Sequence, residues 1–381
     1  MEILDARALP ADHSDILHVT PSSVYFRRRL NSSQFHISRF DLEDQEQSDL
    51  TPDVLQDHGP TRPFVKKGKV YCLNEQDRED GGDGETQLLS IDLHSGKSEH
   101  LATWRLGGDL TLYWVLNERY MVLLHVDGTT TAFLYDVETT REHPIKDERL
   151  YGITENYREL YFFLVTLADI DHIVCNARLD EFSFYDALES GVISPEDPID
   201  HSESLLIAPL STIVAEIEQG VEHLSFRTLL RLDGEGDTVQ YLGEQDGHLV
   251  FSAYTERLNE EVFYEIKEPS AITERERIRW SDFEPLDFTY DDVESTIFIV
   301  NDRSNNHHEV MNLRTGARYL DRDPFERVLR DRFYLHESIG TDAEPMVTVY
   351  DGEQAVRHRF EDAYYMIVSG ELVILSVNQL K

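Results

Sequence analysis

Two carboxylates and an imidazole stand close together at Asp169, Asp171 and His172. Carboxylates at alternate positions of an extended segment point to the same side, where they could chelate a metal ion or share a proton. The neighbouring imidazole is itself a common metal ligand. No second cluster at a recognised ligand spacing accompanies them. We therefore favour a turn with a solvated face, and a metal site formed by Asp169, Asp171 and His172 is the alternative interpretation.

A second acidic segment, Asp77–Glu85, reads DREDGGDGE. Carboxylates spread around glycines can supply the six to eight oxygens that Ca²⁺ requires. The EF-hand spacing, however, needs a carboxylate at the twelfth position of the loop, and Leu88 stands there. The pattern favours a flexible acidic hairpin loop over a calcium site.

Histidines supply no clear constellation either. His307 and His308 are adjacent, so on a strand they would point to opposite faces, and His336-Glu337 is an isolated pair. The sequence holds no GxSxG elbow, HExxH, Walker A, strand-linked GxGxxG or paired CxxC motif. The catalytic residues, if there are any, are therefore unknown from the sequence, and no cofactor is predicted.

The elements that carry these residues are predicted to be strands. Period-2 alternation and β-branched or aromatic runs dominate from about residue 16 to the end. A strand, an acidic turn and a second strand recur in Leu88–Leu101, Ala132–Ile145 and Glu309–Leu320. A recurrence every ~40–50 residues is typical of a β-propeller. We predict a single all-β domain over residues 1–381, with four-stranded antiparallel blades.

The number of blades follows from the outer hairpins. Eight units are favoured and seven are the alternative. The fourth unit, from Tyr151 to Leu179, and the fifth, which includes Ser225–Leu232 and Thr238–Gly243, are the least clearly delimited. The last two strands, Tyr364–Val368 and Glu371–Val377, could complete the first blade or belong to an incomplete last one.

Three irregular insertions interrupt the rhythm, near residues 43–63, 74–86 and 189–220. In the third, apolar residues have helical spacing, and Ser204 could cap such a helix. The β-branched residues argue equally for two strands, so the pattern leaves helix or strand open. The helical set is Leu206, Leu210, Ile213, Val214 and Ile217.

Charge limits the partners. The 74 Asp and Glu residues outweigh 35 Lys and Arg residues, for a net charge of −39, and only 7 residues are Lys. Such a field repels nucleic acid and anionic membranes and favours cationic partners and divalent cations. Excess carboxylate with scarce Lys would also suit a high-salt cytoplasm. The basic run Arg27-Arg28-Arg29 is expected to pair with carboxylates.

The cellular compartment is predicted from targeting signals, apolar stretches and cysteines. Its first residues have no basic and apolar leader pattern, and no stretch approaches 18 apolar residues. Cys72 and Cys175 lie in apolar strand patterns, which predicts buried free thiols in a reducing cytoplasm.

The hairpins Ile91–Lys97 (IDLHSGK) and Asn312–Arg318 (NLRTGAR) resemble the outer hairpins of WD40-like and quinoprotein-like β-propellers. Tyr135–Glu142 is similar, with Thr140 where the others have Gly. The resemblance is at superfamily level, and it implies a protein-binding or small-ligand-binding scaffold rather than an enzyme. The alternative it leaves open is a hydrolase-like or lactonase-like enzyme with a divalent cation such as calcium in the central channel.

Overall fold

The structure is a computed structural model, and it describes residues 3–51, 53–56, 63–76, 84–127, 129–147, 150, 161–178, 202–234, 236–245, 248–280, 285–291, 296–303, 307–312, 318–321, 327–329, 333–337, 346–350, 356–368 and 371–376. The chain divides into two compact units, Met1–Glu142 with Asp331–Lys381, and His143–Arg330. Each unit is described by itself. The predicted single domain over residues 1–381 stays a prediction.

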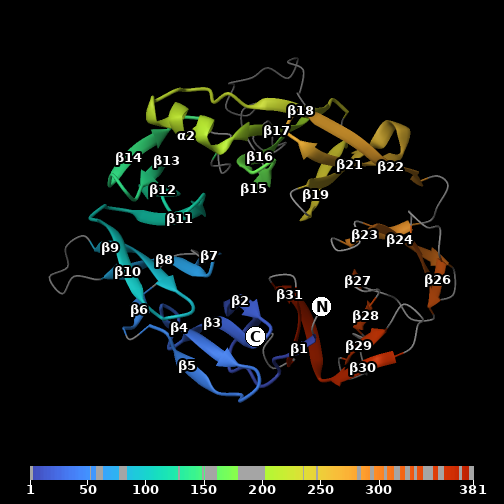
Figure 1. Cartoon of the computed structure of the whole chain (residues 1–381), viewed down its shortest axis with the longest axis horizontal. Coiled ribbons are helices and arrows are strands. Elements are labelled where there is room, and N and C mark those ends of the chain that lie inside the picture. The colour runs from blue at the N-terminus through green and yellow to red at the C-terminus, as the bar shows by residue number, and fades with distance from the viewer. Residues whose placement is uncertain are drawn as a thin grey trace, which may run out of the picture. The chain divides into compact units, whose positions relative to one another are not determined.

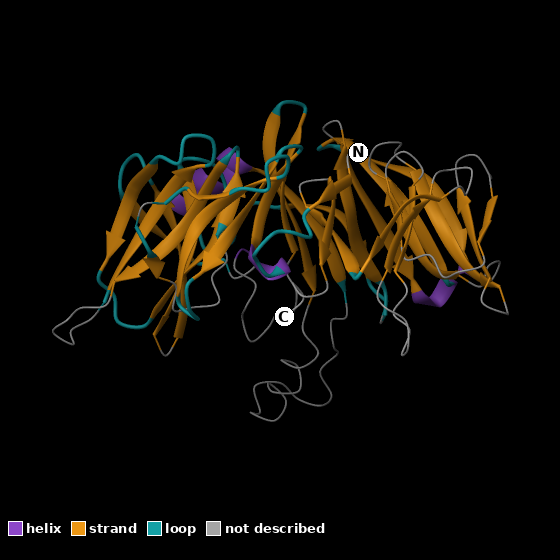
Figure 2. Cartoon of the chain, turned by 90° about the horizontal axis from the view of Figure 1, so that it is seen from below, coloured by secondary structure: helices purple, strands orange, loops and turns teal. Residues whose placement is uncertain are grey.

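Strands make up nearly all of the described elements (Figure 2). One three-stranded sheet brings the two ends of the chain together, with β1 (Ile3–Asp5), β31 (Ala363–Val368) and β32 (Glu371–Ser376). A five-stranded sheet follows, with β2 (Ile16–Thr20), β3 (Ser23–Arg29), β4 (Gln34–Asp41), β5 (Gln47–Asp49) and β6 (Leu55–Gln56).

Six sheets have four strands each, taken in chain order (Figure 1). The first three are β7 (Phe64–Lys66), β8 (Lys69–Gln76), β9 (Glu85–Asp92) and β10 (Ser98–Trp104); β11 (Asp109–Val115), β12 (Tyr120–Asp127), β13 (Thr129–Asp136) and β14 (Arg141–Ile145); and β15 (Tyr161–Leu167), β16 (Ile170–Arg178), β17 (Glu203–Pro209) and β18 (Arg227–Leu232). The others are β19 (Thr238–Gln245), β20 (His248–Thr255), β21 (Glu260–Glu268) and β22 (Ala271–Arg279); β23 (Pro285–Asp291), β24 (Thr296–Arg303), β25 (His307–Asn312) and β26 (Arg318–Asp321); and β27 (Arg327–Leu329), β28 (Phe333–Glu337), β29 (Met346–Tyr350) and β30 (Val356–Glu361).

The fold is a β-propeller of antiparallel blades, as predicted, but the predicted number of blades is wrong. Among the described residues six sheets are four-stranded blades, fewer than the eight, or seven, that were expected. The supposed fifth unit does not exist, because β18 closes the sheet of β15–β17 while β19 opens the next sheet. The other two sheets have five and three strands, and β1 pairs with β32 in parallel rather than antiparallel.

Strand alternation explains how the sheets stack. In β8, Tyr71 and Leu73 pack into one buried cluster, while Val70 and Cys72 pack into another on the opposite face. Successive side chains of a strand point to opposite faces, so a sheet packed on both sides needs a nearly continuous apolar run. The hydrophobic core of this unit therefore lies between sheets and is divided into separate clusters.

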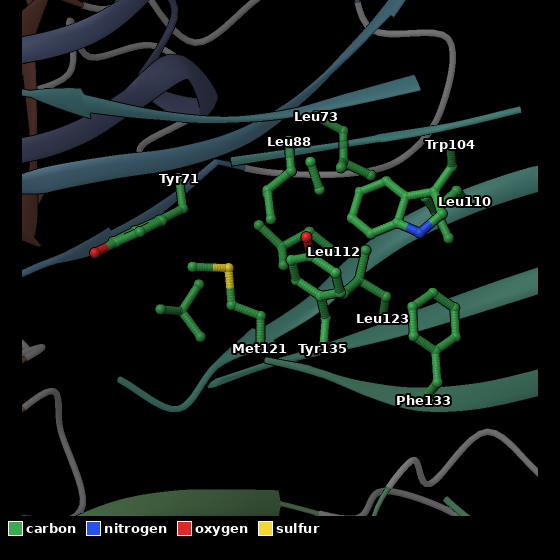
Figure 3. Close-up of a cluster of buried hydrophobic side chains, with 12 residues drawn as sticks. Tyr71, Leu73, Leu88, Trp104, Leu110, Leu112, Met121, Leu123, Phe133 and Tyr135 are labelled. Atoms are coloured by element: carbon green, nitrogen blue, oxygen red, sulfur yellow. The ribbon is translucent and has the colours of Figure 1, made fainter. Parts of the chain in front are cut away.

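Figure 3 shows the cluster between the sheets β7–β10 and β11–β14. Trp104 lies edge-on to Tyr135 with ring centroids 5.1 Å apart, and its indole Nε1 donates to Glu142 Oε1 at 2.6 Å. Its apolar body therefore packs while its polar atom is satisfied, as buried tryptophans require. In the second unit an equivalent cluster joins the sheets β15–β18 and β19–β22.

The repeated acidic turn has a structural role. Asp92 Oδ1 accepts hydrogen bonds from the Ser95 backbone N–H and hydroxyl. Asp136 does the same for Thr139, and Asp41 Oδ1 accepts from two backbone N–H groups of its own turn. An Asp side chain that bonds the backbone two or three residues later fixes a tight turn. The recurring Asp therefore explains the hairpins that the sequence repeats.

The third insertion contains both a strand and a helix. Strand β17 (Glu203–Pro209) runs directly into helix α2 (Leu210–Glu218), which buries Leu210, Ile213, Val214 and Ile217. Ser204 lies inside the strand and caps nothing; Pro209 is at the N-cap without a side-chain hydrogen bond. Two short 3₁₀ turns, η1 (His13–Asp15) and η3 (Glu256–Leu258), complete the described helices. Residues 189–201 lie outside the described residues.

The other two insertions are partly strand. Residues 43–63 include β5 and β6, and residues 74–86 include the end of β8 and the start of β9. Residues 52, 57–62 and 77–83 lie outside the described part of the chain. None of the helices in the described part is long and apolar enough to cross a membrane.

The arginine run pairs with carboxylates, as the sequence predicted. Arg27 and Arg29 both contact Asp15, at 3.0 Å and 2.8 Å, and Arg28 contacts Asp49 at 2.5 Å on the other face of β3. Asp15 is buried, so the two arginines supply the compensation that a buried carboxylate needs.

Candidate functional site

An open depression of about 430 Å³ lies in the first unit, beside the ends of β1 and β32. Its walls come from the end of β1, the β4–β5 turn, the β30–β31 turn and the end of β32. The volume falls within the range of small-ligand sites in proteins, roughly 300–1,000 Å³. The lining residues are Asp5, Arg7, Ala8, Gln45, Glu361, Asp362 and Ser376. We call this depression the terminal hollow.

One side of the terminal hollow carries a paired charge. The Arg7 guanidinium donates from Nε to Asp5 Oδ1 at 2.9 Å and from Nη2 to Asp5 Oδ2 at 2.8 Å. Its Cζ lies 5.4 Å from the centroid of the Phe360 ring, a cation–π distance. This hydrogen bonding lowers the pKa of Asp5 and raises that of Arg7. The Asp5 carboxylate is therefore ionised, and the positive charge of Arg7 balances its negative charge.

The other side carries two consecutive carboxylates. Glu361 and Asp362 are both exposed; Glu361 ends β30, and Asp362 connects it to β31. Asp362 adopts φ +50° and Gln45, across the hollow, φ +56°. Both lie in the left-handed region, which Asp tolerates better than most residues. The terminal hollow thus holds three carboxylates against one guanidinium, and it is suited to a positively charged ligand.

The lining offers little for covalent catalysis. Ser376 supplies a hydroxyl, but none of the described residues that line the hollow is a His or Cys that could activate it as a nucleophile. What the arrangement can do is accept hydrogen bonds and attract positive charge.

The sequence-predicted metal residues lie in the second unit, in the hairpin between β15 and β16. Ala168 and Asp169 have φ of +50° and +62°, which makes a two-residue primed turn. Asp171 Oδ1 accepts from the Thr166 hydroxyl at 2.8 Å. The His172 ring is buried, with Nδ1 2.7 Å from the Ile170 carbonyl oxygen. Each of the three residues thus has a local role in the hairpin.

No group of three or more His, Cys, Asp or Glu residues in the described part of the chain is arranged to hold a metal ion, and Asp169, Asp171 and His172 are within that part. The acidic loop lies outside the described residues except for Gly84 and Glu85. Of the histidine pairs, only the backbone is described.

Sequence reasoning missed the terminal hollow. Its residues come from four separate places in the chain, and none stands in a motif. The only available signal was Glu361-Asp362, two acidic residues directly before a strand, and pairs of that kind are common in a chain with 74 Asp and Glu.

Comparison with known proteins gives no family. No protein-family model matches the chain, and no curated protein matches it. Solved structures with a similar fold include TolB from Acinetobacter baumannii (9% identity, 92% of this chain, 81% of that chain, TM-score 0.30) and the β-propeller domain of the Trilobed protease from Pyrococcus furiosus (10% identity, 91% and 97%, TM-score 0.40). A third is the protein lmo1340 from Listeria monocytogenes EGD-e (7% identity, 94% and 96%, TM-score 0.45). The likeness is one of propeller fold, and nothing about function follows from it.

Proposed function

We propose that this chain is a β-propeller binding module whose terminal hollow takes a positively charged ligand, either a small organic cation or a basic side chain of a protein partner. The observation that carries the proposal is the exposed Glu361-Asp362 pair beside an Asp5 carboxylate that Arg7 already neutralises. The net charge of −39 supports it, because the surrounding field attracts cations and speeds their encounter.

The test is isothermal titration calorimetry, which measures the affinity and stoichiometry of binding of a short arginine-rich peptide at physiological ionic strength. Glu361→Gln combined with Asp362→Asn removes both charges, and Asn is tolerated at the positive φ of residue 362. Glu268→Gln combined with Asp127→Asn is the matched control, because it removes the same two charges from exposed sites elsewhere.

We expect saturable one-to-one binding to the parent and control proteins, and binding weakened about tenfold or more in the hollow variant, equivalent to about 1.4 kcal/mol. Equal weakening in the two variants would mean diffuse attraction to an acidic chain, and the proposal would fail. An uncharged peptide of the same length should not bind.

We propose a reducing, cytoplasmic location for the protein. Cys72 and Cys175 are buried thiols that form no disulfide, and they lie in different sheets, which suits a compartment where thiols stay reduced. Fractionation of cells that express a tagged chain tests this, and recovery outside the cytoplasmic fraction would contradict it.

The enzyme alternative, with a divalent cation, gains no specific support from the described residues. A saturable, stoichiometric rise in melting temperature with Ca²⁺, reversed by EDTA, would revive it.

A further inference from the structure

A buried polar network lies inside the second unit, between the sheets β15–β18 and β19–β22. Glu203 Oε1 accepts a hydrogen bond from the Val239 backbone N–H at 2.8 Å and another from Asn176 Nδ2. Glu203 and Asn176 are only 3% and 7% exposed. Because Glu203 Oε1 accepts from both groups, the Asn176 amide is oriented with its nitrogen toward Glu203.

That orientation leaves Asn176 Oδ1 buried, and it accepts no hydrogen bond from the protein. An unsatisfied buried acceptor costs about 1–3 kcal/mol, so native structures rarely tolerate one. The fixed amide cannot turn to relieve this cost, because turning would place two acceptor oxygens against each other.

A small cavity adjoins the amide. It gives the centre of a water-sized molecule about 10 Å³, which is room for one water. Most of its lining is apolar, and Asn176 supplies the one side-chain amide. The lining residues are Val174, Asn176, Leu205, Val239, Tyr241, Leu249 and Phe251.

The backbone beside the cavity is also irregular. The ladder between β19 and β20 shifts register between Tyr241 and Gly243, opposite Phe251 and Val250. A bulge of this kind takes one residue out of the regular ladder and makes its backbone groups available to another partner. A buried water needs two to four polar partners, and the bulge begins at Tyr241, which lines the cavity.

We propose that one structural water molecule occupies this cavity and donates a hydrogen bond to Asn176 Oδ1. The interface between the two sheets then contains a specific binding site for one water molecule. The water completes the Glu203–Asn176 network, and the carboxylate, the amide and the water together link β16, β17 and β19.

The direct test is a crystal structure of the unaltered protein at a resolution that shows ordered water. We expect a fully occupied peak inside the cavity, about 2.7–3.2 Å from Asn176 Oδ1. A cavity without density, or an Oδ1 that accepts from a protein donor instead, would overturn the proposal.

A second measurement uses the same protein in solution with labelled methyl groups. A long-lived buried water should give nuclear Overhauser cross-peaks to the methyls of Val174 and Leu249, which line the cavity, and none to Ile213, which is fully buried but does not line it. Asn176→Leu should abolish the cross-peaks if the variant folds. If the unaltered protein gives no cross-peak at Val174 or Leu249, the cavity holds no such water.

Discussion

One residue of the repeated turn has the same unusual backbone in three copies. Four positions after the turn Asp, Gln45, Gly96 and Thr140 have φ of +56°, +68° and +55°. Glycine adopts this conformation without strain, whereas a β-branched residue does so at a cost of roughly 1–2 kcal/mol. Thr140 is therefore strained, and the rest of its hairpin holds it in place.

Thr140→Gly should stabilise the first unit by about 0.5–1 kcal/mol, because relief of strain exceeds the added freedom of the unfolded chain. The reverse change in the sister turn, Gly96→Thr, is the control and should destabilise. A Cβ at residue 96 would lie 3.1 Å from the Leu50 carbonyl oxygen. Urea unfolding measures both. If Thr140→Gly lowers the midpoint, the backbone at residue 140 is not strained.

Asp136 combines the turn with an ion pair. Its oxygens receive Nε and Nη2 of Arg119 at 2.9 Å and 2.8 Å, and also the Thr139 hydroxyl. The hydrogen bonds from Arg119 hold the pKa of the buried Asp136 carboxyl far below its usual range. The lowered folded-state pKa means that the ion pair contributes stability above the unfolded pKa of about 3.9, and that this contribution is lost as the pH falls further.

Asp136→Asn keeps the turn acceptor and removes the charge, so it should cost about 1–2 kcal/mol at neutral pH. The cost should shrink as the pH falls below about 4. Asp92→Asn, in the sister turn where the hydroxyl and backbone N–H of Ser95 bond the carboxylate, is the control and should show a smaller loss. Guanidinium unfolding from neutral to acid pH gives both series, and a loss in Asp136→Asn that does not change with pH would contradict the assignment.

At the scale of elements, the apolar face of helix α2 packs against the protein core. Ile213 is fully buried, with 0% of its surface accessible to solvent. Helix α2 packs against β16 and β17. Ile213→Ala should cost about 2–5 kcal/mol through lost burial and the cavity left behind. Ser211→Ala on the exposed face should change stability by less than about 0.5 kcal/mol. Similar urea midpoints for the two variants would mean that α2 adds little to the unit.

The sequence could predict elements whose signal is local. The Asp turns carry their own hydrogen-bond acceptor, so the hairpins within Leu88–Leu101 and Ala132–Ile145 were found correctly, as β9–β10 and β13–β14. β1 was missed because three residues, Ile3–Asp5, show no periodicity. The false unit over 225–243 arose because β18 and β19 are consecutive strands that pair with different sheets, and strand pairing is not a local property.

The same reason explains the sites. The predicted carboxylates at Asp169 and Asp171 are near in sequence; Asp169 stands in the primed turn, and Asp171 accepts a hydrogen bond from the Thr166 hydroxyl. The terminal hollow is the opposite case, because residues as distant as Asp5 and Asp362 meet only through the pairing of β1 with β32. Its charges could be counted from the sequence, but their convergence could not.

At the scale of the whole molecule, like charges dominate. With 74 acidic and 35 basic residues, repulsion between carboxylates opposes compaction at neutral pH and low salt. Raising the salt from about 0.01 M to about 1 M shortens the screening length from about 30 Å to about 3 Å. We expect the melting temperature to rise by several degrees over this range, although exposed ion pairs such as Arg28–Asp49 weaken.

Differential scanning calorimetry in NaCl, with sucrose of equal osmolality as the control, measures this effect. A melting temperature that stays constant or falls with salt would contradict it and would remove the case for a high-salt cytoplasm. A rise that continues to molar salt would strengthen that case.

The parallel pairing of β1 with β32 also determines how the first unit bears tension. Ile3 lies beside Leu372 and Asp5 beside Ile374, so a pull on the two ends of the chain drags the strands past each other along their length. The backbone hydrogen bonds between them are then loaded together in shear, whereas an antiparallel terminal pair would be peeled open one bond at a time. The three-stranded sheet should therefore resist unfolding when the chain is pulled from its two ends.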